Sequence, residues 1–341
     1  MTTTAVSVGG PWFEDFKVGQ VFADAPALTL TDGLATLHQS LSGDRLRLPL
    51  DHELSREMTG SSQPVAHPTL VCHIAVGQTT GASQRVKGNL FYRGLEMLQP
   101  VHLGDTLTTV AEVVALRQNR PKPGRPATGL VVLRVQVANQ HDTPVLDYWR
   151  CPMIPLRDPA GDTGHADSFD EITADVDAAT LASRVDGWGW RLAAFRDRTG
   201  SEWPHFAEVD PGTHFVVDGR DTVTGATELA RATLNIASAH TDPAAGPSGR
   251  RLVYGGHTIS LAGAATTRAL PNLVTILAWR SCDHTGPVFE GDVVRTEVTV
   301  DAVHPMTAGG LVELHAVVWA DHGDGEPEQP VLDWHFVGLM A

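Results

Sequence analysis

Alternating apolar and polar residues mark the strands of this chain. Six segments share the pattern: Thr106 to Leu116, Gly129 to Asn139, Val145 to Ile154, Val293 to Val303, Gly310 to Ala320 and Val331 to Met340. Alternation of this kind is typical of antiparallel strands that have one packed face. Three segments fall in each half of the chain, so the pattern predicts two similar antiparallel sheets.

The sequence of each half also predicts a buried helix before these strands. The first extends from Pro68 to about Thr80, and the second from about His257 to Leu270. The second, HTISLAGAATTRAL, carries small residues on nearly every face, which favours burial on most sides. A short opening strand, Gln20 to Ala23 or Thr213 to Val217, and a short helix after Thr31 or Thr224 come before it. We therefore expect a helix lying in the curve of an antiparallel sheet, twice.

Matching segments indicate that the two halves are copies of one unit. Gln99–Asp105 (QPVHLGD) returns 187 residues later as GPVFEGD, and PVLDY at Pro144 returns 186 residues later as PVLDW. VGQVF at Val18 matches PGTHF 193 residues later. Repetition in the same order at a nearly constant offset predicts two units, residues 1–157 and 201–341. Residues 158–200 are expected to form a linker, with a connecting helix over 178–198 interrupted around two glycines, Gly187 and Gly189.

Composition narrows the classes of function. The chain has 341 residues and a formal net charge of −15, which disfavours nonspecific nucleic-acid binding and an anionic membrane surface. A local cluster of arginines could still hold a phosphorylated ligand. The three cysteines have no metal-binding spacing, so we expect neither a disulfide framework nor a metal site. The start of the chain lacks a basic and apolar leader, and no apolar run reaches membrane-spanning length. A cytoplasmic location is therefore expected.

One region of the second unit resembles a known family of enzymes. Asn235 precedes His240 by five positions, His240-Thr241-Asp242 follows, and GRRLVYGGH (Gly249 to His257) leads into the predicted buried helix. With GNLFYRG (Gly88 to Gly94) of the first unit, this pattern resembles the MaoC-like (R)-specific enoyl-CoA hydratases. It is most similar to the mesaconyl-CoA hydratases, also called β-methylmalyl-CoA dehydratases. The resemblance implies an α+β double hotdog fold, although pattern alone leaves another two-layer α+β fold open.

The resemblance also implies roles for individual residues. Hydration of an enoyl thioester needs a base for water, a proton for the α-carbon and stabilisation of an enolate oxygen. His240 suits acid–base work, and Asn235 can orient water but cannot take its proton. The backbone N–H groups of Gly255 and Gly256, after Tyr254, would form the oxyanion hole. Most family members have Asp where this chain has Asn235, so His240 acts alone or a carboxylate such as Asp242 or Asp283 assists it.

The first unit lacks the matching pair, since Pro49 stands five positions after Asp44. We expect this unit to be catalytically silent and to shape the pocket. A mesaconyl carboxylate and the CoA phosphates require cations or donors, for which the candidates are Arg250, Arg251, His257, His284 and Arg93. CoA would enter as part of the substrate, and no metal or organic cofactor is implied.

Two other functions remain open. Hotdog folds also include acyl-CoA thioesterases, but those commonly use an acidic residue on the central helix, and HTISLAGAATTRAL contains none. A noncatalytic acyl-thioester binding subunit is the third alternative, disfavoured by the Asn235 and His240 pair. The expected partner is a small acyl-CoA molecule. The duplication would pair two units within one chain, which leaves further assembly into a homodimer open.

Overall fold

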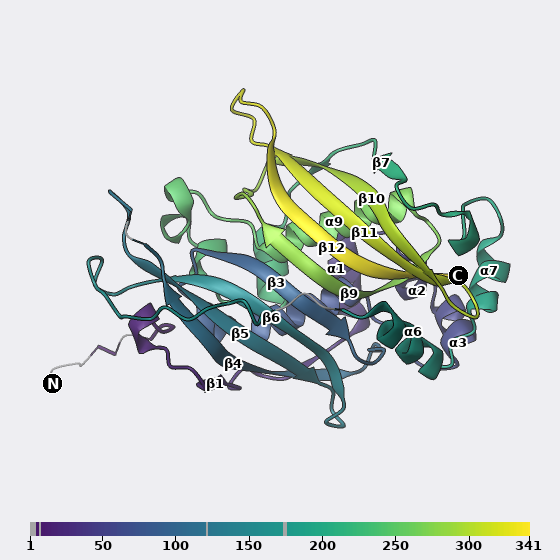
Figure 1. Cartoon of the computed structure of the whole chain (residues 1–341), viewed down its shortest axis with the longest axis horizontal. Coiled ribbons are helices and arrows are strands. Elements are labelled where there is room, and N and C mark those ends of the chain that lie inside the picture. The colour runs from purple at the N-terminus through teal and green to yellow at the C-terminus, as the bar shows by residue number, and fades with distance from the viewer. Residues whose placement is uncertain (1–4, 7, 121, 173–175) are drawn as a thin grey trace.

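The computed structural model describes the chain except for residues 1–4, 7, 121 and 173–175. In this described part, twelve strands form one antiparallel sheet in the order β1-β4-β5-β6-β3-β9-β12-β11-β10-β7, with β2 beside β4 and β8 beside β10 (Figure 1). The first half contributes β1 (Val21–Phe22), β2 (Leu28–Thr29), β3 (Gly88–Met97), β4 (Thr106–Gln118), β5 (Thr128–Ala138) and β6 (Pro144–Pro155). The second contributes β7 (His214–Val216), β8 (Asp221–Thr222), β9 (Leu273–His284), β10 (Val293–Pro305), β11 (Gly310–Asp321) and β12 (Gln329–Met340).

A central helix packs against the sheet in each half. In the first half α4 (Pro68–Gln78), continued by α5 (Thr80–Ser83), packs against β4 and β9; in the second, α9 (Gly255–Ala269) packs against β10 and β11. Every residue of α4 is buried, and α9 is buried from Gly256 to Thr267. The two predicted buried helices are confirmed. A helix of small and apolar residues can be enclosed by the sheet and by neighbouring helices without burying unpaired charges.

Smaller helices complete the two halves. They are α1 (Asp32–Ser42), α2 (Arg47–Leu50), α3 (His52–Thr59) and α8 (Ala226–Ala232), with 3₁₀ turns at Phe13–Asp15, Phe206–Glu208, Ser238–His240 (η3), Pro243–Ala245 (η4) and Pro247–Gly249. The predicted connecting helix is two helices, α6 (Ala178–Gly187) and α7 (Leu192–Thr199). Gly189 between them has φ +67°, a conformation that ends a helix. No helix in the described part of the chain is long and apolar enough to cross a membrane.

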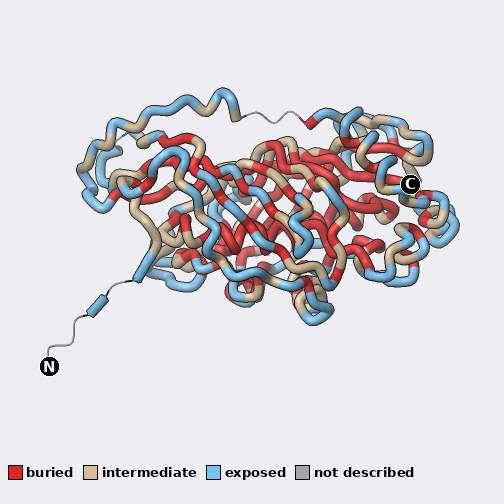
Figure 2. The backbone as a smooth tube through the Cα atoms, turned by 90° about the horizontal axis from the view of Figure 1, so that it is seen from below, coloured by how far each residue is buried: buried red, intermediate tan, exposed pale blue. Residues whose placement is uncertain are grey.

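The two halves meet through strands that the alternation pattern misses. β3 pairs with β9, with Tyr92 opposite Cys282 and Arg93 opposite Ser281. The first seven residues of β9, LVTILAW, are all buried, so this segment shows no alternation and resembles any buried apolar run. Within the described residues each half therefore has four long strands, the three that alternation marks and one, β3 or β9, that it misses. Figure 2 shows that buried backbone runs through the centre of the molecule.

Candidate active site

An open cavity of about 510 Å³ lies between the two halves. The first half contributes residues of α4, α5, β3 and β6, and the second contributes η3, the start of α9 and the end of β9. Its polar and charged lining residues are Thr80, Lys87, Asn89, Tyr92, Arg125, Arg150, Asn235, His240, Tyr254, Thr258, His284 and Thr285. The structure thus brings Asn235, His240, Tyr254, Gly255 and His284 of the predicted site together. We call this space the open cavity.

His240 is held as a neutral base at the wall of the open cavity. It ends η3 and is only 8% exposed. Its Nδ1–H donates to the Leu252 carbonyl over 2.9 Å, which fixes the tautomer and leaves Nε2 as the acceptor. Burial lowers the pKa of His240 to about 4; the Leu252 hydrogen bond raises it, and the charge of Arg150 lowers it further. At neutral pH Nε2 can therefore accept a proton, and the one proton of the ring, on Nδ1, is held by the Leu252 carbonyl.

Asn235 is presented by a strained turn after α8. Leu234, before it, has φ +61°, which costs a non-glycine residue about 1–2 kcal/mol. The turn lies against α4 at Gly77, where a Cβ would stand 1.6 Å from the Thr233 carbonyl oxygen, so only glycine fits. Asn235 Oδ1 accepts from the Ala237 N–H at 3.0 Å, which leaves the amide NH₂ to donate elsewhere. Asn235 is 4% exposed, so this orientation is fixed beside the cavity.

The N-terminus of α9 opens into the same cavity. Tyr254 is its N-cap residue, and its side chain caps no helical N–H in the described structure. At Gly255 a Cβ would stand 2.5 Å from the His284 ring, and at Gly256 it would stand 2.5 Å from both His73 and the Tyr254 ring. Gly255 lines the cavity, whereas Gly256 lets Tyr254 pack closely. An uncapped helix N-terminus offers backbone N–H groups and partial positive charge to an oxygen anion.

Two arginines of the GRRLVYGGH stretch lie outside the open cavity. Arg250 lies over the Phe289 ring at 3.9 Å and pairs with Asp292 at 3.5 Å. Arg251 pairs with Glu290. Neither is among the residues that line the cavity. The structure therefore does not bring these two cations to the position where a substrate anion was expected.

Three other expected site residues also lie elsewhere. Arg93 pairs with Asp283 at 2.7 Å, so neither ion faces the cavity. Asp242 is exposed and caps η4 by accepting from the Ala244 N–H. His257 is buried in α9 and contacts the Leu41 carbonyl at 3.3 Å. In the described structure no carboxylate lines the cavity beside His240, so neither Asp242 nor Asp283 is placed to assist it.

Arg150 lines the open cavity and was not among the expected site residues. It lies in β6, is 3% exposed, and is held by Thr79, Val76, Ser83 and Asn89. The sequence carries a signal for it: Arg150 follows the buried Leu146 and Tyr148 at every second position of the strand, so its side chain is on the same face as theirs. A charged residue at an inward position of a strand is rarely buried unless something pairs with it.

A basic groove adjoins the open cavity. It has a volume of about 690 Å³ and shares Lys87, Leu90, Arg125, Met153 and Pro247 with the cavity. Arg120 and Lys122, from the segment between β4 and β5, also line it, and no Asp or Glu of the described chain does. In a protein of net charge −15, this local excess of cations indicates an anionic ligand.

The internal repeat relates the open cavity to a nearly filled space of about 20 Å³, which we call the twin cavity. Eleven of its thirteen lining residues lie 187 positions from a residue that lines the open cavity: Val65, Ala66, Pro68, Val71, Met97, Gln99, Pro100, Val101, Thr275, Ile276 and Leu277. The other two are Trp188 and Trp190. Two linker tryptophans therefore occupy the place that corresponds to the open cavity.

Asp44 is the counterpart of Asn235 in the first half. The residue after each donates its backbone N–H to a threonine of the opposite half. Ile236, after Asn235, donates to Thr80 at 3.1 Å, and Arg45, after Asp44, donates to Thr267 at 3.2 Å. Asp44 is 1% exposed, and His67 Nε2 contacts its carboxylate at 3.0 Å. Burial raises the pKa of Asp44, but His67 and the hydrogen bonds from Thr267 and the Leu46 N–H bring it below the usual value.

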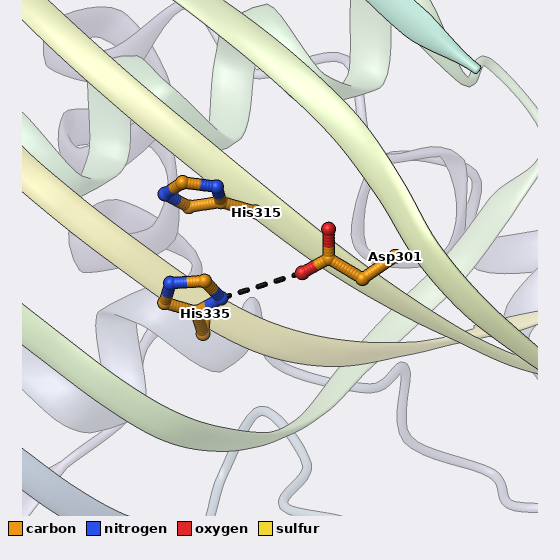
Figure 3. A group of neighbouring side chains, drawn as sticks. All are labelled: Asp301, His315 and His335. Carbon is orange, nitrogen blue, oxygen red and sulfur yellow. Dashed lines mark ion pairs between the residues drawn. The ribbon is translucent and has the colours of Figure 1, made fainter. Parts of the chain in front are cut away.

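A separate cluster on the second half has metal-ligand chemistry. Asp301, His315 and His335 place ligand atoms within 4.8 Å of one another on β10, β11 and β12 (Figure 3). The two imidazoles stack at 3.9 Å with an angle of 9°, and Asp333 contacts both. Parallel rings direct their nitrogen lone pairs side by side rather than toward one ion. These residues alternate with the buried Leu314 and Trp334, so the cluster lies on the face opposite α9 and supplies nothing to the cavity.

Solved structures define the class of protein. A Mycobacterium tuberculosis protein, described as a conserved hypothetical protein essential for survival during infection and as a double hotdog, matches with a TM-score of 0.90 and 47% identity, over 98% of this chain and 100% of that one. A Chloroflexus aurantiacus protein, described as a MaoC domain dehydratase, matches with a TM-score of 0.81 and 29% identity over 99% of each chain. The chain is a MaoC-like α+β protein with a double hotdog fold, as predicted.

Sequence comparison then gives the family. The profile of the mesaconyl-CoA hydratase family matches residues 2–269. The β-methylmalyl-CoA dehydratase of Chloroflexus aurantiacus is 34% identical over 296 residues, covering 84% of this chain and 80% of the relative. The mesaconyl-CoA hydratase of Cereibacter sphaeroides is 32% identical over 293 residues, covering 84% and 82%. The chain belongs to the mesaconyl-CoA hydratase family, and it is a hydro-lyase.

Proposed function

We propose that the chain interconverts mesaconyl-CoA and β-methylmalyl-CoA in the open cavity, with His240 as the acid–base residue. The observation that carries this proposal is the state of His240. Its Nδ1–H is committed to the Leu252 carbonyl, its pKa is lowered to about 4, and it lines a cavity of substrate size. The names of the two curated relatives supply the substrate pair.

The proposed reaction uses one proton-transfer group. His240 Nε2 takes a proton from water as the water oxygen bonds to the β-carbon of the enoyl group, and the alkene electrons move toward the thioester oxygen. The imidazolium then gives that proton to the α-carbon, so the net addition is one water. Asn235, which cannot accept a proton, donates from its amide and orients the water. Return of the same proton makes an additional carboxylate unnecessary.

The N-terminus of α9 is proposed to stabilise the enolate oxygen. Gly255 lines the open cavity at the first residue of the helix, and the Tyr254 side chain caps no helical N–H in the described structure. Negative charge develops on the thioester oxygen during hydration, and preorganised N–H donors stabilise it most when water is excluded. Gly256 contributes by permitting the close packing of Tyr254 and His73 rather than by lining the cavity.

The basic groove is proposed to receive the CoA phosphates. Lys87 and Arg125 line both the groove and the cavity. A substrate with its acyl group in the open cavity can therefore place its nucleotide in the basic groove. In this arrangement a single chain supplies both walls of the site, and catalysis does not require a second copy. We propose one active site per chain and no cofactor other than the CoA of the substrate, so chelator treatment should leave the rate unchanged.

The direct test follows the ultraviolet absorbance of conjugated enoyl thioesters during hydration of mesaconyl-, crotonyl- and longer enoyl-CoA. We expect loss of mesaconyl-CoA absorbance without thiol release, and a rate about 10³- to 10⁴-fold lower in His240→Gln. His315→Gln is a matched control, because it removes a histidine of the same half that faces away from the cavity. Thiol release without hydration would instead show a thioesterase, and full activity in His240→Gln would refute the assignment.

A further inference from the structure

Arg150 is a buried cation that no carboxylate of the described structure neutralises. Its guanidinium donates to Thr79 Oγ1 at 2.6 Å, and to the Val76 carbonyl, Ser83 Oγ and Asn89 Oδ1 at 3.3–3.4 Å. All four acceptors are uncharged. Two other arginines on strands of the first half differ: Arg93 pairs with Asp283 at 2.7 Å and Arg134 pairs with Asp147 at 2.8 Å.

The location of Arg150 indicates where its missing anion would lie. Arg150 is 3% exposed and lines the open cavity together with Asn89 and His240. Burial of an unpaired charge is costly, so such a group is retained where an anion completes it. The cations of the basic groove, Lys87, Arg120, Lys122 and Arg125, stand outside or at the edge of the cavity and suffice for phosphates. Arg150 is therefore available to an anion on the acyl group.

The second half shows that the fold itself does not require this arginine. Tyr92 and Trp279 are 187 positions apart and hold corresponding places on β3 and β9. In the sheet, Tyr92 lies opposite Arg150, whereas Trp279 lies opposite Phe336. Phe336, an apolar residue that is 1% exposed, thus holds the corresponding place in the second half. The charge accompanies the open cavity rather than the hotdog unit.

We propose that Arg150 binds a carboxylate on the acyl chain and so makes the open cavity selective for enoyl thioesters of dicarboxylic acids. This assignment rests on the proposed function and adds its specificity residue. Four neutral acceptors orient the planar guanidinium and take four of its five N–H groups, which leaves one N–H on Nη2 and the positive charge to meet a carboxylate. Arg150 would act on the substrate end remote from the thioester, while His240 and the α9 N-terminus act on the reacting carbons.

The test compares two thioesters that differ only at this carboxylate. One is mesaconyl-CoA, and the other is (E)-2-methylbut-2-enoyl-CoA, which has a methyl group in its place. We expect the wild type to prefer mesaconyl-CoA by about 100-fold or more in kcat/KM, because a site built for a polar group rejects an analogue that lacks it. In Arg150→Gln we expect that preference to fall to within a few fold, through loss of mesaconyl-CoA hydration alone.

Arg150 also contacts the C-terminal end of α4 at Val76, so a purely structural role must give a different result. In that case Arg150→Gln would reduce hydration of both thioesters equally, which would overturn the proposal. Arg150→Lys, which keeps the charge, should recover part of the mesaconyl-CoA activity, and Arg93→Gln is the control for loss of an arginine on the adjacent strand.

Two further results would decide the matter if Arg150→Gln failed to fold. A wild type that hydrates both thioesters equally would also refute carboxylate binding while leaving the hydratase function intact. Competitive inhibition by free mesaconate, stronger than by (E)-2-methylbut-2-enoate, would support it. Hydration of neither thioester by the wild type would contradict the proposed function itself.

Discussion

The open cavity and the twin cavity are lined by corresponding residues, but only the twin cavity is nearly filled by side chains. The first retains about 510 Å³ and the second about 20 Å³, although eleven lining residues of the second repeat in the first. Gly255 and His284 of the open cavity correspond to Pro68 and Met97 of the twin cavity, so backbone donors and an imidazole give way to apolar atoms. Trp188 and Trp190 then fill the remaining space.

The polar pairs beside the two cavities differ in the same way. Next to the open cavity, Asn235 and His240 each hydrogen-bond to backbone and leave a side-chain group facing the cavity. In the first half, Asp44 and His67 hydrogen-bond to each other and are fully buried. One copy thus keeps this polar pair open to the cavity, and the other pairs the corresponding polar groups with each other inside the protein. Each prediction below tests one part of this division.

The largest effect is expected from His67→Phe. This change leaves the buried Asp44 carboxylate without its imidazole partner, and an uncompensated buried charge costs about 3–5 kcal/mol. We expect the free energy of unfolding, measured by chemical denaturation, to fall by that amount while hydration stays within about threefold of wild type. His240→Gln should show the reverse pattern. Lost activity with unchanged stability in His67→Phe would mean that His67 itself takes part in catalysis.

Removal of the tryptophans should have the next largest effect. Both side chains are half-buried, so the double variant Trp188→Ala/Trp190→Ala should lose about 2–4 kcal/mol of unfolding free energy, less than two fully buried residues would. Hydration in the open cavity should be unaffected. Trp203→Ala removes a tryptophan that is 45% exposed and serves as the control, with an expected change below about 1 kcal/mol. A double variant as stable as this control would show that the tryptophans merely cover the twin cavity.

Sequence patterns predicted the repeated parts of this comparison well. The strands alternate because one face meets a central helix, and the central helices are recognisable because they lack large polar residues. The resemblance to the hydratase signature selected Asn235, His240 and Gly255, and all three line the open cavity because one turn and one helix start carry them there. These features depend on residues close together in the chain, where periodicity and motif spacing are informative.

Features that depend on distant residues were not predictable. β3 and β9 meet across the two halves, and the continuous burial of LVTILAW hides its strand period. The tryptophans of the linker reach a cavity that only the folded repeat creates. Arg93, Arg250 and Arg251 were reasonable cations, but each pairs with a carboxylate instead: Arg93 on β3 with Asp283 of the neighbouring β9, and Arg250 and Arg251, in the loop before α9, with Asp292 and Glu290. Arg150 lies far from the motif in sequence and reaches it through the pairing of β6 with β3.

A pH profile tests the electrostatic side of the comparison. Burial lowers the pKa of His240 to about 4, and the reactive form is neutral, so kcat/KM should be flat from about pH 5.5 to 8 and fall only toward pH 4. The buried His38 and His73 also have lowered pKa values. Below about pH 6.5 the unfolded chain therefore binds more protons than the folded one, and stability declines as pH falls. Circular dichroism at each pH separates these effects, and an activity midpoint near pH 6.5 in folded protein would contradict a desolvated His240.

The smallest effects are expected at the arginines that the sequence placed near the site but the structure does not. Arg250 is half-exposed and pairs with Asp292, and Arg251 pairs with Glu290, so Arg250→Gln and Arg251→Gln should each change stability by less than about 1 kcal/mol. Their KM for mesaconyl-CoA should stay within about twofold of wild type. Arg125→Gln, in the basic groove, should raise KM several fold, and this increase should shrink at high salt because screening weakens phosphate contacts. A larger effect at Arg250 than at Arg125 would mean that the nucleotide crosses the GRRLVYGGH surface and not the groove, and the anion-binding side of the open cavity would then lie on the second half rather than the first.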